Sequence, residues 1–193
     1  MSMSTGAMTE RIAEASPRFK ARMAGVFYVL TILTGVFALF VRGRLGVTAG
    51  LIAGACYIAV TLLFYYIFKP VNRRLSLLAA FISLVGCAVG PLSRFHLVPF
   101  HINSLVFFGF YCLLIGYLIF RSTFLPRSLG FGMVIGGLGW LTFLSPPLAE
   151  YLSPYNLAPG ILGEGALTLW LLVKGVDEQR WMEQAGAAGE WRS

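Results

Sequence analysis

The stretch LGVTAGLIAGACYIAVTLLFYYIF, Leu45–Phe68, contains 24 consecutive residues without a charged side chain. An α-helix rises about 1.5 Å per residue, so a run of this length can cross the roughly 30 Å hydrocarbon core of a bilayer. Apolar helices in the cores of soluble proteins are shorter, with runs of about 10–14 residues. The stretch therefore predicts a transmembrane helix.

Five further apolar runs lie on either side of this stretch. None of them alternates polar and apolar residues as the strands of a transmembrane β-barrel do. Together the runs predict an all-α fold, a polytopic transmembrane bundle of six helices. The expected helices cover Met23–Val41, Leu45–Phe68, Leu75–Ser93, Ile102–Phe120, Ser128–Ser145 and Leu157–Val173.

The composition excludes an ordinary soluble domain. Hydrophobic residues make up 58% of the 193 residues and charged residues only 12%, whereas soluble domains carry about 25% charged residues. So few charges cannot cover the surface of a soluble protein of this size.

The expected helices divide the chain into three parts. Residues 1–20 form a polar, mobile leader, residues 21–176 one six-helix transmembrane domain, and residues 177–193 a cytoplasmic tail. The segment VDEQRWMEQ, Val176–Gln184, is interpreted as a polar extension of the last helix. The first apolar run is longer than the roughly 7–15 residues of a signal-peptide core and lacks a cleavage site, so we expect it to be retained.

The basic residues predict the orientation. With six spans, twelve of the fifteen lysines and arginines fall on the side of the two termini, and only Arg42, Arg44 and Arg94 fall on the other side. Because an excess of Lys and Arg marks cytoplasmic loops, we expect a multi-pass protein of the inner (plasma) membrane with both termini in the cytoplasm. The net charge of +7 thus reflects topology, and we expect no nucleic-acid partner.

Small residues recur at four-residue spacing within three of the runs. Such faces let helix backbones approach closely in lipid. Packing within the chain is the preferred interpretation, and association with a second copy is the alternative. The glycines of this pattern are Gly46, Gly50 and Gly54 in the second run, Gly86 and Gly90 in the third, and Gly132 and Gly136 in the fifth.

The cysteines and histidines predict no bound group. Cys56, Cys87 and Cys112 lie in the middle of three different apolar runs and form no C-x-x-C pair. A zinc site built from His96, His101 and Glu164 would lack a recognised ligand spacing. We therefore expect no metal and no cofactor, and the sequence contains no recognisable catalytic set.

The candidate polar cluster is Glu164 together with Arg94, His96 and His101. Arg94 and the histidines belong to GPLSRFHLVPFH, Gly90–His101, which is expected at the outer rim of the third and fourth helices. Glu164 lies seven residues into the sixth run, and a carboxylate within a membrane is costly unless it is protonated, paired or beside water. Three interpretations stay open: a structural ion pair with Arg94, a protonated carboxyl bonded to Tyr, Ser or backbone, and a site for a ligand, proton or substrate.

Four stretches resemble the DUF4386 family of uncharacterised bacterial integral membrane proteins. They are ARMAGVFYVLTILTGVFALFVRGRL (Ala21–Leu45), KPVNRRLSLLAAF (Lys69–Phe81), YCLLIGYLIFRSTFLPRSLG (Tyr111–Gly130) and ILGEGALTLWLLVKGVDEQRWMEQA (Ile161–Ala185). The resemblance extends from about Ala21 to Ala185. It implies a polytopic membrane protein and brings no established reaction.

Three classes of function follow from these observations. The first is non-enzymatic binding of a lipid-like small molecule, or of a membrane partner or second copy, by a protein surrounded by membrane lipids. The second is a small proton-coupled carrier that uses Glu164. The third is a membrane-embedded enzyme that uses Glu164 with Arg94 and His96 or His101.

Overall fold

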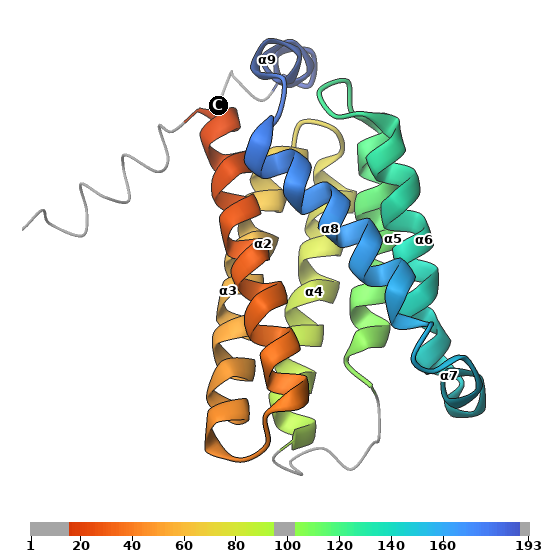
Figure 1. The fold of residues 1–193 in the computed structure, drawn as a ribbon. Coiled ribbons are helices and arrows are strands. Elements are labelled where there is room, and N and C mark those ends of the chain that lie inside the picture. Colours follow the sequence, from red (N-terminus) through yellow and green to blue (C-terminus); the bar gives the residue numbers. More distant parts are fainter. Residues whose placement is uncertain (1–15, 95–102, 190–193) are drawn as a thin grey trace, which may run out of the picture.

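The computed structural model describes residues 16–94 and 103–189, apart from the side chains of Leu39 and Arg94. This part of the chain is helical and contains no strand. In chain order the helices are α2 (Pro17–Phe40), α3 (Arg44–Phe68), α4 (Arg73–Arg94), α5 (Leu105–Arg121), α6 (Arg127–Leu141, followed by a 3₁₀ turn at Thr142–Leu144), α7 (Pro146–Leu152), α8 (Leu157–Val173) and α9 (Glu178–Ala187). Figure 1 shows the longer helices side by side, with α9 across one end of the bundle and α7 at the other.

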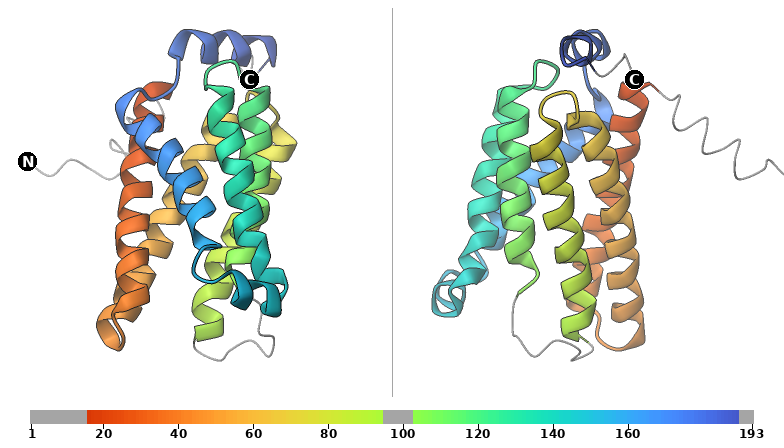
Figure 2. Two further views of the ribbon diagram at one scale, coloured as in Figure 1. Left: turned by 45° about the vertical axis from the view of Figure 1, so that its right-hand side comes forward. Right: turned by 180° about the vertical axis from the view of Figure 1, so that it is seen from behind.

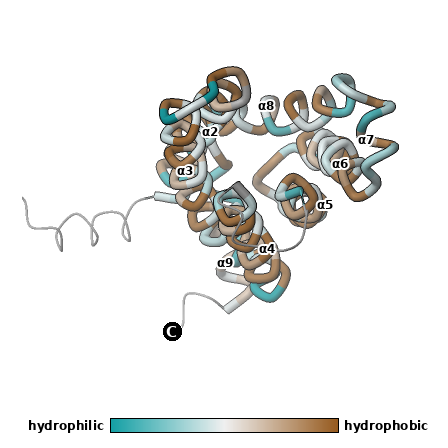
Figure 3. The backbone as a smooth tube through the Cα atoms, turned by 90° about the horizontal axis from the view of Figure 1, so that it is seen from below, coloured by the Kyte–Doolittle hydropathy of each residue, from teal (hydrophilic) through white to brown (hydrophobic). Residues whose placement is uncertain are grey.

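The six longer helices form a closed ring. Each packs mainly against two others, in the order α2, α3, α4, α5, α6, α8 and back to α2. Figure 3 looks along the bundle and shows this arrangement. Helices that follow one another in the chain are thus neighbours, and the first long helix closes the ring against the last. The largest side chains buried in the bundle include Tyr28, Phe64, Tyr111, Ile115, Met133 and Leu167.

The first helix begins at Pro17, six residues before the expected start at Met23. The Ser16 hydroxyl caps it by accepting a hydrogen bond from the backbone N–H of Phe19 at 3.3 Å. Proline suits the first turn because its missing N–H has no helical partner there. Residues 17–20 of the expected mobile leader are therefore helical, while residues 1–15 lie outside the described part.

The described chain contains four to five candidate membrane spans. Four segments are long and apolar enough: Pro17–Ala38, Arg44–Phe68, Arg73–Ser93 and Arg127–Leu144. The pair α7 and α8, bent by 79°, counts as a fifth if it is one broken span. The expected fourth helix corresponds to α5, which is apolar but has only 17 residues. An all-helical bundle with several such helices indicates a membrane protein.

The outer surface of the bundle is apolar. Large hydrophobic side chains point outward from each of the six ring helices, and several are more than half exposed. A soluble protein rarely exposes apolar patches on this scale, whereas lipid tails would cover them at no cost. Examples are Leu33, Phe81, Leu138, Leu162 and Leu169, with Phe110 on α5.

The sequence predicted that the C-terminal segment extends the last long helix. In the structure it forms a separate helix. Gly175 adopts φ +69°, a left-handed conformation that ends α8, and Asp177 caps the separate helix α9 through the backbone N–H of Arg180 at 3.2 Å. Both views in Figure 2 show α9 lying across the end of the bundle. Trp181 anchors it there by donating its indole N–H to the carbonyl of Ile67 at 2.9 Å.

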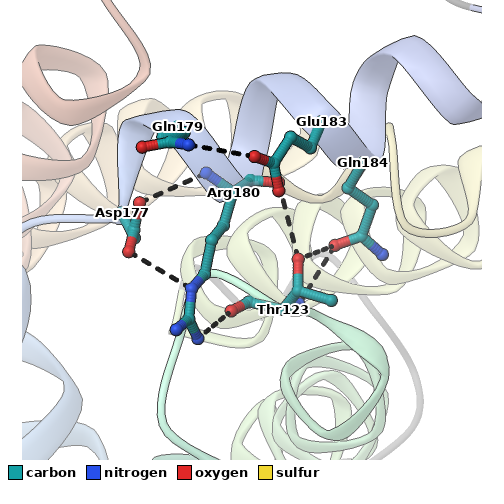
Figure 4. A network of polar contacts seen from close by, with 6 residues as sticks. All are labelled: Thr123, Asp177, Gln179, Arg180, Glu183 and Gln184. Atoms are coloured by element: carbon teal, nitrogen blue, oxygen red, sulfur yellow. Dashed lines mark hydrogen bonds and ion pairs between the residues drawn. The ribbon is translucent and has the colours of Figure 1, made fainter.

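Polar contacts join α9 to the loop between α5 and α6 (Figure 4). Gln184 Oε1 accepts hydrogen bonds from both the backbone N–H and the hydroxyl of Thr123, each at 3.1 Å. The Arg180 guanidinium donates to the carbonyl of Thr123 at 3.4 Å and forms an ion pair with Asp177 at 3.5 Å. These contacts are exposed, so they fix the position of α9 more than they add to stability.

Candidate functional site

Glu164 lies in the interior of the ring, on α8, with only 8% of its surface exposed. The indole Nε1 of Trp140 on α6 donates a hydrogen bond to its Oε1 at 2.7 Å. The thiol of Cys112 on α5 donates to the same oxygen at 3.3 Å. The carboxyl group is therefore held by two neutral donors from two other helices.

A glycine on α8 makes room for the Trp140 indole. Gly160 precedes Glu164 by about one helical turn, so both residues lie on the same face of α8. A Cβ atom added to Gly160 would overlap the Trp140 ring and lie 2.7 Å from its Nε1. The hydrogen bond from Trp140 to Glu164 thus depends on the absence of a side chain at Gly160.

Three buried tyrosines surround this carboxyl group. Tyr28 on α2, Tyr57 on α3 and Tyr111 on α5 are each at least nine-tenths buried, and none of their hydroxyls has a hydrogen-bond partner in the described part. Tyr57 lies between the other two, with ring centroids 5.6 Å from Tyr28 and 5.9 Å from Tyr111. All three interact electrostatically with Glu164.

One further contact brings α4 into the same region and completes the ring. The Thr61 hydroxyl on α3 and the Ser83 hydroxyl on α4 share a hydrogen bond of 2.6 Å, and both side chains are buried. All six ring helices therefore contribute a polar or aromatic side chain to the interior. We call this set the interior cluster: Tyr28, Tyr57, Thr61, Ser83, Tyr111, Cys112, Trp140 and Glu164.

The interior cluster contains one group that can carry a formal charge at neutral pH. Among the buried side chains of the described residues, Glu164 is the only charged type, and the other polar members are Ser, Thr and Asn. The lysines and arginines of the described part lie at helix ends and in loops. A carboxyl group in such surroundings has no basic counterpart among the described side chains of the core.

The other members of the predicted cluster fall outside the described residues. His96 and His101 lie in the range 95–102, and Arg94 ends α4 with its side chain outside the described part. The ion pair between Arg94 and Glu164 stays a prediction, and so does the role of both histidines. The described partners of Glu164 come instead from α5 and α6, since α8 packs mainly against α2 and α6 and not against α4.

The described residues contain no group of three or more His, Cys, Asp or Glu side chains placed to hold a metal ion. The zinc hypothesis also involves His96 and His101, which lie outside the described residues. The three cysteines are free thiols, in keeping with their separate helices.

Three of the seven predicted packing glycines lie at close contacts. A Cβ at Gly46 would overlap the carbonyl of Val41, one at Gly86 would lie 2.9 Å from Phe107 Cβ, and one at Gly136 would lie 3.1 Å from the Pro159 carbonyl. At Gly90 and Gly132 an added Cβ would make ordinary van der Waals contacts, 3.5 Å from Ser104 Oγ and 3.6 Å from Gly163 Cα. Gly54 does not lie at a helix contact, because a Cβ there would meet no atom within 4 Å. Gly50 is half-buried, and its role in packing stays a prediction.

Sequence reasoning missed the close glycine contacts between α5 and α6. Gly116 on α5 and Gly130 on α6 face each other, since a Cβ on either would lie 2.9 Å from the carbonyl of the other. Gly109 and Gly137 form an equivalent pair one heptad away, at 3.0 and 2.8 Å. The signal was the seven-residue spacing of glycines in both runs, which a search for four-residue spacing overlooks.

Comparison with known proteins identifies the family. The family model described as "Domain of unknown function (DUF4386)" matches residues 42–100 and 92–175 of the chain. The chain belongs to this family. An uncharacterised protein of the archaeon Archaeoglobus fulgidus is 27% identical over 127 residues, which cover 61% of this chain and 76% of the relative. No solved structure matches the chain at a significant level. The DUF4386 assignment is compatible with an apolar helical bundle, and the family description names no activity.

Proposed function

We propose that this DUF4386 protein binds a small amphiphilic molecule inside its ring of helices, with the interior cluster holding the polar end of the ligand. The observation that carries the proposal is the set of three buried tyrosine hydroxyls, without a hydrogen-bond partner among the described residues, that interact electrostatically with a buried carboxyl group. Leaving a buried polar group unpaired costs about 1–3 kcal/mol. Phenylalanine would fill the same volume without that cost, so the hydroxyls point to a bound polar group.

The proposal includes a topology of six crossings with both termini in the cytoplasm of the cell, in the inner (plasma) membrane. α5 and α8 each have 17 residues, which meets the lower limit of about 17 for a spanning helix. The start of α2 and α9 lie at the same end of the bundle (Figure 1), as an even number of crossings requires. Twelve of the fifteen basic residues would then face the cytoplasm, in agreement with the positive-inside rule.

A second candidate is a proton-coupled carrier in which Glu164 takes up and releases the coupling proton. The burial of Glu164 at the centre of a ring of helices favours it, because ionisable residues inside membrane bundles commonly lie on transport pathways. Binding of a small molecule is common to both candidates. Flux of protons with substrate in liposomes, lost in Glu164→Gln, would support the carrier over simple binding.

The binding proposal is tested by mass spectrometry of the small molecules that co-purify with the protein in mild detergent. Three proteins are compared: the wild type, an interior triple variant with Tyr28, Tyr57 and Tyr111 changed to Phe, and a surface triple variant. The surface variant changes Tyr66, Tyr151 and Tyr155 to Phe, and these side chains are 54%, 85% and 80% exposed.

We expect a compound that the wild type and the surface variant retain and that the interior variant loses. The tyrosine-to-phenylalanine changes remove only hydroxyls, so they preserve the packing of the core. Equal retention by all three proteins would overturn the assignment of the site. The absence of any bound compound from the wild type would contradict the proposed function.

A further inference from the structure

The charge distribution of the interior cluster restricts which ligands it can hold. Glu164 contributes the only carboxyl group of the described core, and no lysine or arginine is buried beside it. A ligand with a carboxylate or phosphate head would bring a second negative charge into an apolar region without a basic partner. Like charges in such surroundings repel strongly, since little solvent screens them. Anionic lipids are therefore poor ligands for this site.

The interior cluster offers hydrogen-bond acceptors to a bound donor group. Trp140 and Cys112 both donate to Oε1 of Glu164 and not to Oε2, and each tyrosine hydroxyl can accept as well as donate. The hydroxyl oxygens of Tyr28, Tyr57 and Tyr111 are also unused. An ammonium group has three N–H donors and no acceptor. Its donors match an array of one carboxylate oxygen and several hydroxyl oxygens.

Aromatic rings pack among the same polar groups. Tyr57 packs edge-on against Tyr28 and Phe108, with centroid distances of 5.6 Å and 4.7 Å, and Trp140 lies against Glu164. The faces of aromatic rings carry a partial negative charge and attract cations, most strongly where water is excluded. The aromatic rings of the cluster therefore favour a positively charged ligand, as its carboxyl group does.

We propose that the interior cluster binds a lipophilic amine, with the protonated nitrogen beside Glu164 and the tyrosine hydroxyls and with the apolar part of the ligand among the helices. This inference rests on the proposed function and names the class of its ligand. A buried carboxylate held only by neutral donors is stabilised far more by a cation than by a further neutral group. The ligand supplies the positive charge that the described core lacks.

The test compares three ligands with the same apolar chain: dodecylamine, dodecanol and dodecanoate. Binding is measured by the shift in melting temperature of the protein in lipid nanodiscs, at equal concentrations of ligand in the bilayer. The proteins are the wild type, Glu164→Gln and the control Glu150→Gln. Glu150 is an exposed carboxylate on the short helix α7, so the control removes the same charge outside the ring.

We expect the wild type and Glu150→Gln to bind dodecylamine about tenfold or more tightly than dodecanol, the ratio that one charge-assisted hydrogen bond provides. Dodecanoate should bind most weakly. In Glu164→Gln the preference for the amine over the alcohol should disappear. The comparison of ligands on the wild type stands even if this variant folds poorly.

The outcomes separate this inference from the proposed function. Binding of dodecanol or dodecanoate as tightly as dodecylamine would overturn the amine assignment and leave a binding site in place. An amine preference that survives in Glu164→Gln, or that is lost in Glu150→Gln, would also overturn it, because the charge would then act at the surface. No binding of any of the three would contradict the proposed function itself.

Discussion

The indole Nε1 of Trp140 lies 2.7 Å from Oε1 of Glu164, so a single hydrogen bond joins α6 to α8 in the core of the ring. It fixes the direction of the only carboxyl group in the buried part of the described chain. Trp140 can reach that position because Gly160, on the same face of α8, has no side chain. Trp140 and Gly160, neither of which carries a charge, thus orient the carboxyl group of Glu164 together with the thiol of Cys112.

Gly160→Ala should displace the indole and weaken its bond to Glu164. Overpacking of a close contact costs typically 1–3 kcal/mol, and we expect a loss of that size in the free energy of unfolding in detergent. The control is Gly165→Ala on the same helix, where a Cβ would meet no atom within 4 Å. Equal melting temperatures for the two variants would show that the glycine is not required for the position of Trp140.

The hydrogen bond between Thr61 and Ser83 should stabilise the contact of α3 with α4. Thr61→Val or Ser83→Ala alone removes this hydrogen bond from the remaining buried hydroxyl. We expect each single variant to lower the free energy of unfolding by about 1 kcal/mol. The double variant should lose less than the sum, because no unpaired partner remains. Additive losses in a double-mutant cycle, measured by denaturant or thermal unfolding, would contradict a direct interaction.

Gly175→Ala should destabilise the junction between α8 and α9. Gly175 has φ +69°, and a Cβ there would lie 3.0 Å from Arg18 Cγ. A left-handed conformation costs an alanine about 1–2 kcal/mol, and limited proteolysis should detect the released α9. The control is Gly186→Ala within α9, which has open space around it and a helical backbone. Release of α9 in both variants would point to a cause other than the backbone conformation.

The proposed topology predicts which loops a membrane-impermeant thiol reagent can reach in intact cells. In a variant without Cys56, Cys87 and Cys112, a cysteine at Ser153 should react from outside. A cysteine at Ser128 should react only after the membrane is opened. Both serines are exposed in the structure, so labelling depends on the side of the membrane and not on burial. The reverse pattern would overturn the orientation.

The helices of the ring could be located from the sequence because each is a long apolar run, uncharged except for Glu164 in the last, bounded by basic residues, glycine or proline. Their ends shifted by a few residues where a local signal acted, as at Ser16 and Pro17. The all-helical fold class could be predicted without tertiary information. The order of the helices around the ring could not, because hydropathy does not indicate which helices are neighbours.

The candidate site was only partly predictable. Glu164 stood out because a carboxylate in an apolar run is rare, but its described partners did not. Trp140 and Cys112 are ordinary members of apolar runs, and only the ring brings them to Glu164. The pairing of Glu164 with Arg94 was inferred from complementary charge and expected depth, and it stays a prediction because the Arg94 side chain lies outside the described part.

The contact between α2 and α8 also determines when the protein can be completed during synthesis. Helices leave the ribosome in chain order, so Tyr28 and Tyr57 enter the membrane long before Glu164 is made. Until α8 arrives, one side of the ring is open, and the polar side chains of the earlier helices face lipid or the insertion machinery. The interior of the ring can form only after α8 has been inserted between α2 and α6. A chain interrupted before Leu157 would therefore lack the helix that closes the ring between α2 and α6.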